Sequence, residues 1–174
     1  RAYGIELLFK KNSGKLNGWV SYSAGRSELK IEGINQFKWY PTRYDQTHNF
    51  KVTSNYEFND RVSLSGNFSF LTGTPVTFPT SKYVIQGFVI PHNGDNARHQ
   101  NRIPNYHRLD LAVTINGKKF KKNGEQRNNK SSLVIGVYNA YNRKNPFSIY
   151  FSQGEDSVTD SFIPGQVTRL SIIG

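Results

Sequence analysis

The chain has 174 residues, and its 23 lysines and arginines against 12 aspartates and glutamates give it a formal net charge of +11. The length suits one structural unit, so we expect residues 1–174 to form a single domain. The chain has no cysteine, which excludes disulfides, thiolate metal sites and cysteine nucleophiles. No apolar run approaches the about 20 residues of a membrane helix, so a membrane crossing would have to be made by strands.

The first predicted elements form a hairpin. Residues 3–9 and 16–24 alternate between apolar and more polar side chains, and residues 12–14 between them read Asn-Ser-Gly. A period of two predicts strands, and a short polar segment containing glycine predicts the turn that joins them.

A second hairpin follows at residues 50–58 and 62–70, with a turn about Asn59 and Asp60. In both runs the even positions are mostly Phe, Val, Leu or Tyr, and the odd positions are Lys, Arg, Thr, Ser, Asn or Glu. We expect one apolar and one polar face here.

Three more alternating runs, at residues 108–115, 133–137 and 167–172, bring the total to about seven long strands. The chain has almost no helical periodicity. The fold class predicted is therefore all-β and antiparallel.

The connections differ in length. Residues 12–14 and 59–60 make short turns, whereas residues 31–45, 73–106 and 142–164 make long loops. The connection at residues 117–131 falls at the end of the strands that carries the short turns, but it is longer than they are. Strands of about ten residues, short turns at one end and long loops at the other are typical of transmembrane β-barrels, with periplasmic turns and extracellular loops. Alternation alone does not separate a lipid face from the core of a soluble sandwich, which stays an alternative.

Basic residues gather in one of these connections. A chain this basic raises the question of a nucleic-acid partner, but the other basic residues are scattered through loops and strands. We therefore expect a solvated turn and no nucleic acid. The basic residues of this segment are Lys118, Lys119, Lys121, Lys122, Arg127 and Lys130.

Five segments, taken in order, resemble the final strands of TonB-dependent outer-membrane receptors. The variety they resemble most is that of Bacteroidetes, which carries an N-terminal carboxypeptidase-like regulatory domain. The segments are AYGIELLFKKNSGKLNGWVSYS, WYPTRYDQTHNFKVTSNYEFNDRVSLSGNFSFLTGTPVTFP, NRIPNYHRLDLAVTI, VIGVYNAYNRKNPFSIYF and IPGQVTRLSI.

The resemblance implies a 22-stranded barrel in the outer membrane, of which this chain would supply about seven strands. It also implies a plug domain and a TonB box upstream, which would connect the barrel to the energising complex of the inner membrane. Such barrels end on an aromatic residue, so we expect the natural C-terminus to lie beyond Gly174. A surface lipoprotein is a possible further partner, and the nutrient ligand is not defined.

Candidate ligand contacts are aromatic, amide and guanidinium side chains of the expected outer loops, although loop aromatics also serve as packing residues. They are Trp39, Tyr40, Arg43, Tyr83, Phe88, Asn93, Asn96, Arg98 and Arg102. Arg108 and Asp110 lie two residues apart, on one face of their strand, and are expected to pair inside the barrel lumen.

Catalysis and metal binding are not expected. His92 and His99 share a loop with Asp95, but their spacing matches no ligand motif. The sequence has no nucleophile elbow and no glycine-rich phosphate loop, so we expect no catalytic residue and no cofactor.

The leading hypothesis is therefore an energised nutrient transporter. The alternatives are a structural or adhesive outer-membrane barrel and a soluble basic β-domain. A plug domain and TonB box upstream would separate the first two. The soluble domain would show salt-sensitive DNA binding without detergent.

Overall fold

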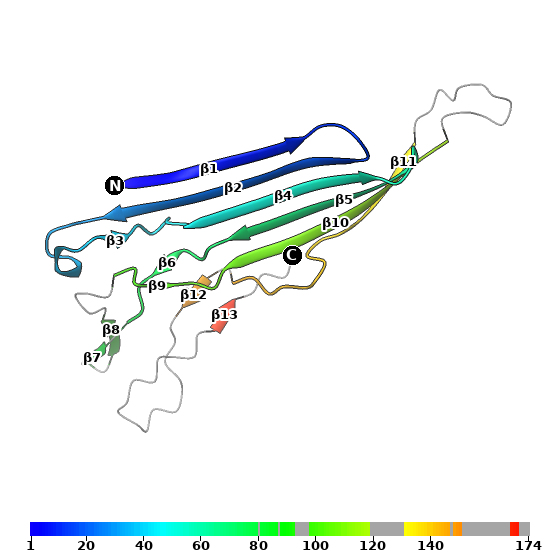
Figure 1. Cartoon of the computed structure of the whole chain (residues 1–174). Helices are drawn as coiled ribbons and strands as arrows, with labels where there is room; N and C mark the ends of the chain where they lie inside the picture. Colours follow the sequence, from blue (N-terminus) through cyan, green and yellow to red (C-terminus); the bar gives the residue numbers. More distant parts are fainter. Residues whose placement is uncertain are drawn as a thin grey trace.

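The computed structural model describes residues 1–79, 81–86, 88–92, 98–118, 131–146, 148–150 and 168–170. Its main element is one antiparallel sheet, whose six long strands lie side by side as a single twisted layer (Figure 1). In their order across the sheet these strands are β1 (Ala2–Lys11), β2 (Leu16–Leu29), β4 (His48–Glu57), β5 (Val62–Leu71), β10 (Tyr106–Asn116) and β11 (Ser132–Val137).

Shorter elements gather at one end of this sheet, which we call the loop end (Figure 1). The opposite end, which carries the connections 12–15 and 58–61, is the turn end. Antiparallel pairs join β2 to β3, β6 to β9, β7 to β8 and β12 to β13. The short elements are η1 (Asn35–Phe37), β3 (Tyr40–Pro41), β6 (Pro75–Val76), β7 (Ser81–Ile85), β8 (Phe88–His92), β9 (Asn101–Arg102), β12 (Ser148–Tyr150) and β13 (Thr168–Leu170).

Both predicted hairpins are confirmed, as is the all-β antiparallel class. β1 pairs with β2 and β4 pairs with β5, with the turns where the sequence places them. Of the predicted strand at residues 167–172, the described part is β13, which pairs with β12 and not with the main sheet. The basic residues from Lys119 to Lys130 lie outside the described residues, as do Asn93, Asp95 and Asn96.

The register of the sheet sorts side chains onto two different faces. One cross-strand row is apolar throughout, and the row next to it, on the other face, is mainly polar. The apolar row is Phe9, Val20, Val52, Phe68 and Leu109. The row beside it is Lys10, Trp19, Thr53, Asn67 and Asp110. The β4–β5 hairpin therefore has one apolar and one polar face, as the alternation of its side chains predicts.

No second layer covers the apolar face within the described residues. Tyr40, at 3% exposure, is the one buried hydrophobic residue of the described part, whereas Phe9 is 68% and Ile135 58% exposed. In this part of the chain β1 and β11 are the two edges of the sheet, which does not close on itself. Among the same residues no helix is long and apolar enough to cross a membrane.

Candidate functional site

The loop end is held together by a buried carboxylate. Asp45, only 2% exposed, accepts a hydrogen bond from the Ser27 backbone N–H through Oδ1 at 2.7 Å and forms an ion pair with Arg102 through Oδ2. The Arg102 guanidinium also donates to the backbone oxygens of Asp45 and Gly73, at 3.0 and 2.9 Å. The Arg102 guanidinium therefore joins the segment before β4 to the loop after β5. The backbone of β2 is joined to the same Asp45 carboxylate through Ser27.

A second link joins the same two loops through the side-chain amide of Asn35. Its Nδ2 donates to the Arg98 carbonyl at 2.9 Å, and its Oδ1 accepts from the Arg98 N–H at 3.1 Å. Asn35, Gln36 and Phe37 all adopt left-handed backbone conformations, with φ of 51°, 55° and 57°. Such conformations are costly for residues other than glycine, and the paired hydrogen bonds of Asn35 help to offset that cost.

His99 makes the third contact between these loops. Its Nδ1 lies 2.9 Å from the Pro41 carbonyl oxygen, and because a carbonyl only accepts, this nitrogen carries the proton. The His99 ring lies beside the buried Tyr40 ring, with 6.0 Å between centroids. We call the contacts of Asp45, Asn35 and His99 the loop clamp.

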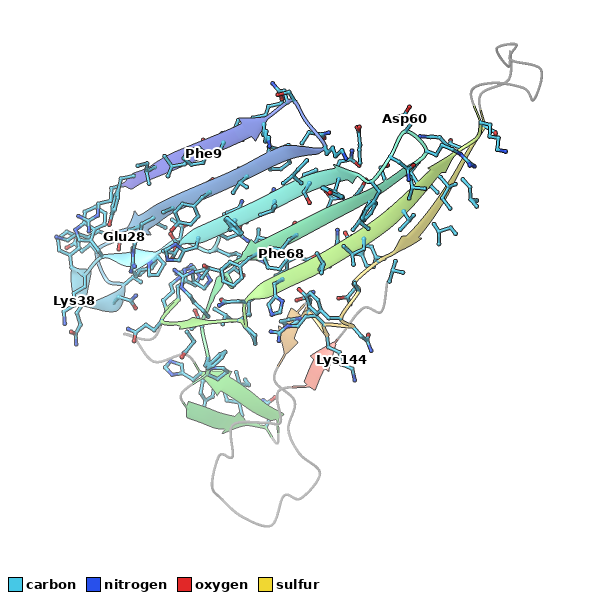
Figure 2. The ribbon with its side chains drawn as sticks, turned by 45° about the vertical axis from the view of Figure 1, so that its right-hand side comes forward. Phe9, Glu28, Lys38, Asp60, Phe68 and Lys144 are labelled. Carbon is cyan, nitrogen blue, oxygen red and sulfur yellow. The ribbon has the colours of Figure 1, made fainter. Side chains whose placement is uncertain are left out.

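Glu28 fixes the end of β2 beside the clamp. Its buried carboxylate accepts hydrogen bonds from Arg1 at 2.8 Å and Arg26 at 3.0 Å, and the Arg1 guanidinium lies 4.1 Å above the Trp39 ring. Burial raises the pKa of Glu28, but the hydrogen bonds and positive charges of the two arginines outweigh it, so the pKa lies below its ordinary value of 4.5. Figure 2 places Glu28 and Lys38 at the loop end and Asp60 at the turn end.

The structure brings only some of the predicted ligand contacts together. Tyr40, Arg98 and Arg102 belong to the loop clamp, where contacts within the chain hold them. Trp39 lies under Arg1. Their role as ligand contacts stays a prediction.

The remaining candidates lie apart from the clamp. Arg43 is exposed. Tyr83, on β7, is 45% exposed, and its ring lies 6.0 Å from that of His92 on β8, the strand that also carries Phe88. Among the described residues no group of three or more metal-ligating side chains is found.

Arg108 and Asp110 form an ion pair on β10, with 2.9 Å between Nη2 and Oδ2. The Asp110 Oδ1 accepts from the Asn139 backbone N–H at 2.9 Å, and the Arg108 guanidinium lies 4.2 Å from the centre of the Tyr138 ring. The pair thus connects β10 to the segment after β11. That it faces a barrel lumen stays a prediction.

Sequence reasoning missed a shallow hollow of about 610 Å³ at the loop end, between β1, β2 and the segment at residues 44–46. Its lining includes Glu6, Ser23 and Asn49, which lie side by side in one cross-strand row of the polar face. No local signal in the sequence marks it, since the row exists only through the register of three strands. The loop clamp is structural in character, whereas the hollow is open to a ligand.

Removing the Arg102 side chain should open the loop clamp. Arg102→Ala leaves the buried Asp45 carboxylate without its partner, which costs about 3–5 kcal/mol. Chymotrypsin should then cleave the clamped loops at least about 100-fold faster, because cleavage follows the open population. Arg43→Ala is the matched control, since Arg43 is exposed and makes no hydrogen bond or ion pair within the described residues. Equal cleavage rates for the two variants would contradict the clamp.

The Glu28 site should loosen in acid. A carboxyl whose pKa is lowered by folding contributes stability above its unfolded pKa, and that contribution is lost as the pH falls through the lowered folded value. In a Trp19→Phe background, the fluorescence of Trp39 should therefore change as the pH falls below 4.5. Glu28→Gln cannot ionise and should remove this transition; its persistence in that variant would assign it to another group.

Comparison with models of protein families, with curated proteins and with solved structures finds no match to this chain.

Proposed function

We propose that the chain forms part of the wall and outer loops of an outer-membrane β-barrel, in a TonB-dependent receptor that imports a nutrient. One observation carries the proposal: a single antiparallel layer of long strands has an exposed apolar face and a polar opposite face. In a lipid-embedded barrel the first face contacts hydrocarbon and the second contacts water.

Aromatic side chains at the loop end support a membrane boundary. The cross-strand row there is Tyr22, Phe50, Phe70 and His107. The Tyr22 hydroxyl lies 2.8 Å from His48 Nδ1, and the Tyr141 hydroxyl lies 2.7 Å from His107 Nδ1. Side chains with an apolar body and a polar tip suit the border between hydrocarbon and headgroups.

A second boundary lies near the turn end, where the rings of Tyr56 and Phe58 meet edge to face, 4.9 Å apart. From His48 to Phe58 the chain advances about 34 Å along the strand, at about 3.4 Å per residue. At a tilt of about 40° this corresponds to a height of roughly 26 Å, close to the about 25 Å apolar band of outer-membrane barrels. The spacing of the two boundaries therefore fits a bilayer.

The polar face supports a wet lumen. Lys51, Arg108 and Asp110 project from the face opposite the apolar rows, and lipid would not solvate these charges. The two sheet edges also favour a barrel, because edge strands expose unpaired backbone groups that closure satisfies.

The resemblance to TonB-dependent receptors supplies the transport part of the proposal. A structural or adhesive barrel would share the two faces of the sheet but would need no energised uptake. The loop clamp fits either function, since it gives the outer loops a defined shape.

The facing of the strands predicts unequal costs for two arginine substitutions on β5. Phe68→Arg places a charge on the lipid face between the two aromatic boundaries, in the row of Val52 and Leu109, and should lower the free energy of unfolding by about 2–4 kcal/mol. Asn67→Arg is the matched control, because Asn67 lies on the polar face in the row of Asp110 and should cost much less. Urea titration of the complete receptor refolded into lipid vesicles measures both. Equal costs would contradict the assignment of the faces.

Energised uptake is tested in cells. A strain that lacks the complete receptor should lose growth on one scarce nutrient, and the wild-type receptor should restore it only when the TonB complex is intact. Restored growth without TonB, or unchanged growth on every nutrient despite correct insertion of the receptor, would instead favour the structural or adhesive barrel.

A further inference from the structure

The hollow on the polar face has a row of hydrogen-bonding side chains on one side and a floor of backbone on the other. Glu6, Ser23 and Asn49 are paired across β1, β2 and β4, so neighbouring members stand about 5 Å apart. The next row toward the loop end pairs Gly4 with Gly25. Neither has a side chain, and the hollow therefore reaches down to the backbone.

Several polar side chains of the hollow are uncommitted. Within the described residues, no hydrogen bond or ion pair engages the side chains of Glu6, Ser23, Gln46 or Asn49. Asp45 and Arg26, which also line the hollow, differ. Asp45 binds Ser27 and Arg102, and Arg26 binds Glu28. A ligand in the hollow would thus meet donors and acceptors that are free to bind it.

Tyr44 adds an aromatic surface beside this row. Its side chain is 82% exposed although the next residue, Asp45, is 2% exposed and clamped. The backbone that carries the ring is therefore fixed, while the ring itself lines the hollow. An exposed aromatic ring on a fixed backbone provides a surface on which a ligand can stack.

We propose that this hollow binds an uncharged sugar ring of the imported nutrient. The hydroxyls of a pyranose would donate to the Glu6 carboxylate and the amide oxygens of Gln46 and Asn49, and its C–H face would pack on Tyr44. Arg26 and Asp45 are paired with Glu28 and Arg102, so Glu6 brings the unpaired charge of the hollow, and its negative sign disfavours anionic sugars. A volume of about 610 Å³ suits a ligand of a few rings. The inference rests on the proposed function, because it takes the polar face as the lumen wall.

The test is calorimetric titration of the complete receptor, folded in detergent, with four neutral trisaccharides and one anionic one. The neutral probes are maltotriose, cellotriose, mannotriose and galactotriose, and the anionic probe is trigalacturonate. We expect at least one neutral probe to bind and the anionic probe not to bind. Tyr44→Ala should weaken the binding by about tenfold through loss of stacking.

Gly25→Val tests the hollow itself. A Cβ at Gly25 would lie 3.5 Å from its nearest neighbour, an ordinary contact, so the strand accepts a β-carbon there. We expect the valine methyl groups to extend into the hollow. Binding should be lost. Gly136→Val is the matched control, because Gly136 is also a strand glycine of the polar face, with nearest contacts of 3.6 Å, and should bind as the wild type does.

Two results would overturn the sugar site: no neutral probe binds the wild-type receptor, or Gly25→Val and Tyr44→Ala both bind as the wild type does. Insertion into lipid vesicles is measured on the same samples. If the receptor inserts but binds no sugar, the sugar site is rejected and the barrel proposal is kept. If the protein binds sugar but does not insert, the barrel proposal is rejected and the sugar site is kept.

Discussion

The constraint on which the structure depends is that an antiparallel register in a single layer leaves one apolar face without a protein partner among the described residues. A large apolar side chain gains about 1.5–3 kcal/mol when it is fully buried, and residues such as Phe9 and Ile135 gain little of this from the described chain. Whatever covers that face supplies the missing stabilisation. In our account lipid does so, and the polar charges must then face water on the other side.

The loop end meets a different constraint, because it has little apolar core within the described residues. Its one buried hydrophobic residue in the described part is Tyr40. Polar contacts stabilise the rest of the loop end. Arg102 neutralises the buried Asp45 carboxylate, and the Asn35 side-chain amide pairs with the backbone N–H and carbonyl of Arg98. This arrangement fixes the strand ends beside the hollow, so that a surface site keeps its shape without a hydrophobic core beneath it.

The strands could be predicted from the sequence because their signal is local. Alternation on both sides of Asn59 and Asp60 defines a hairpin without knowledge of the rest of the chain, and the β4–β5 pairing agrees. The loop contacts could not be predicted, since Asp45 and Arg102 are separated by 57 residues. Arg102 was expected to face a ligand, but its ion pair depends on how two distant loops meet. The hollow could not be predicted for a similar reason. It arises from the register of β1, β2 and β4 and from the missing side chains of Gly4 and Gly25.

The most direct measurement of the central claim is a comparison of neighbouring positions on one strand. The chain has no cysteine, so single cysteines at Val52 and Thr53 of β4 can each carry a fluorescent probe. The account predicts that, in lipid vesicles, a quencher attached to the acyl chains quenches the probe at Val52 strongly and the probe at Thr53 weakly, with the reverse order for a water-soluble quencher. Equal quenching at both positions would contradict a lipid-facing sheet.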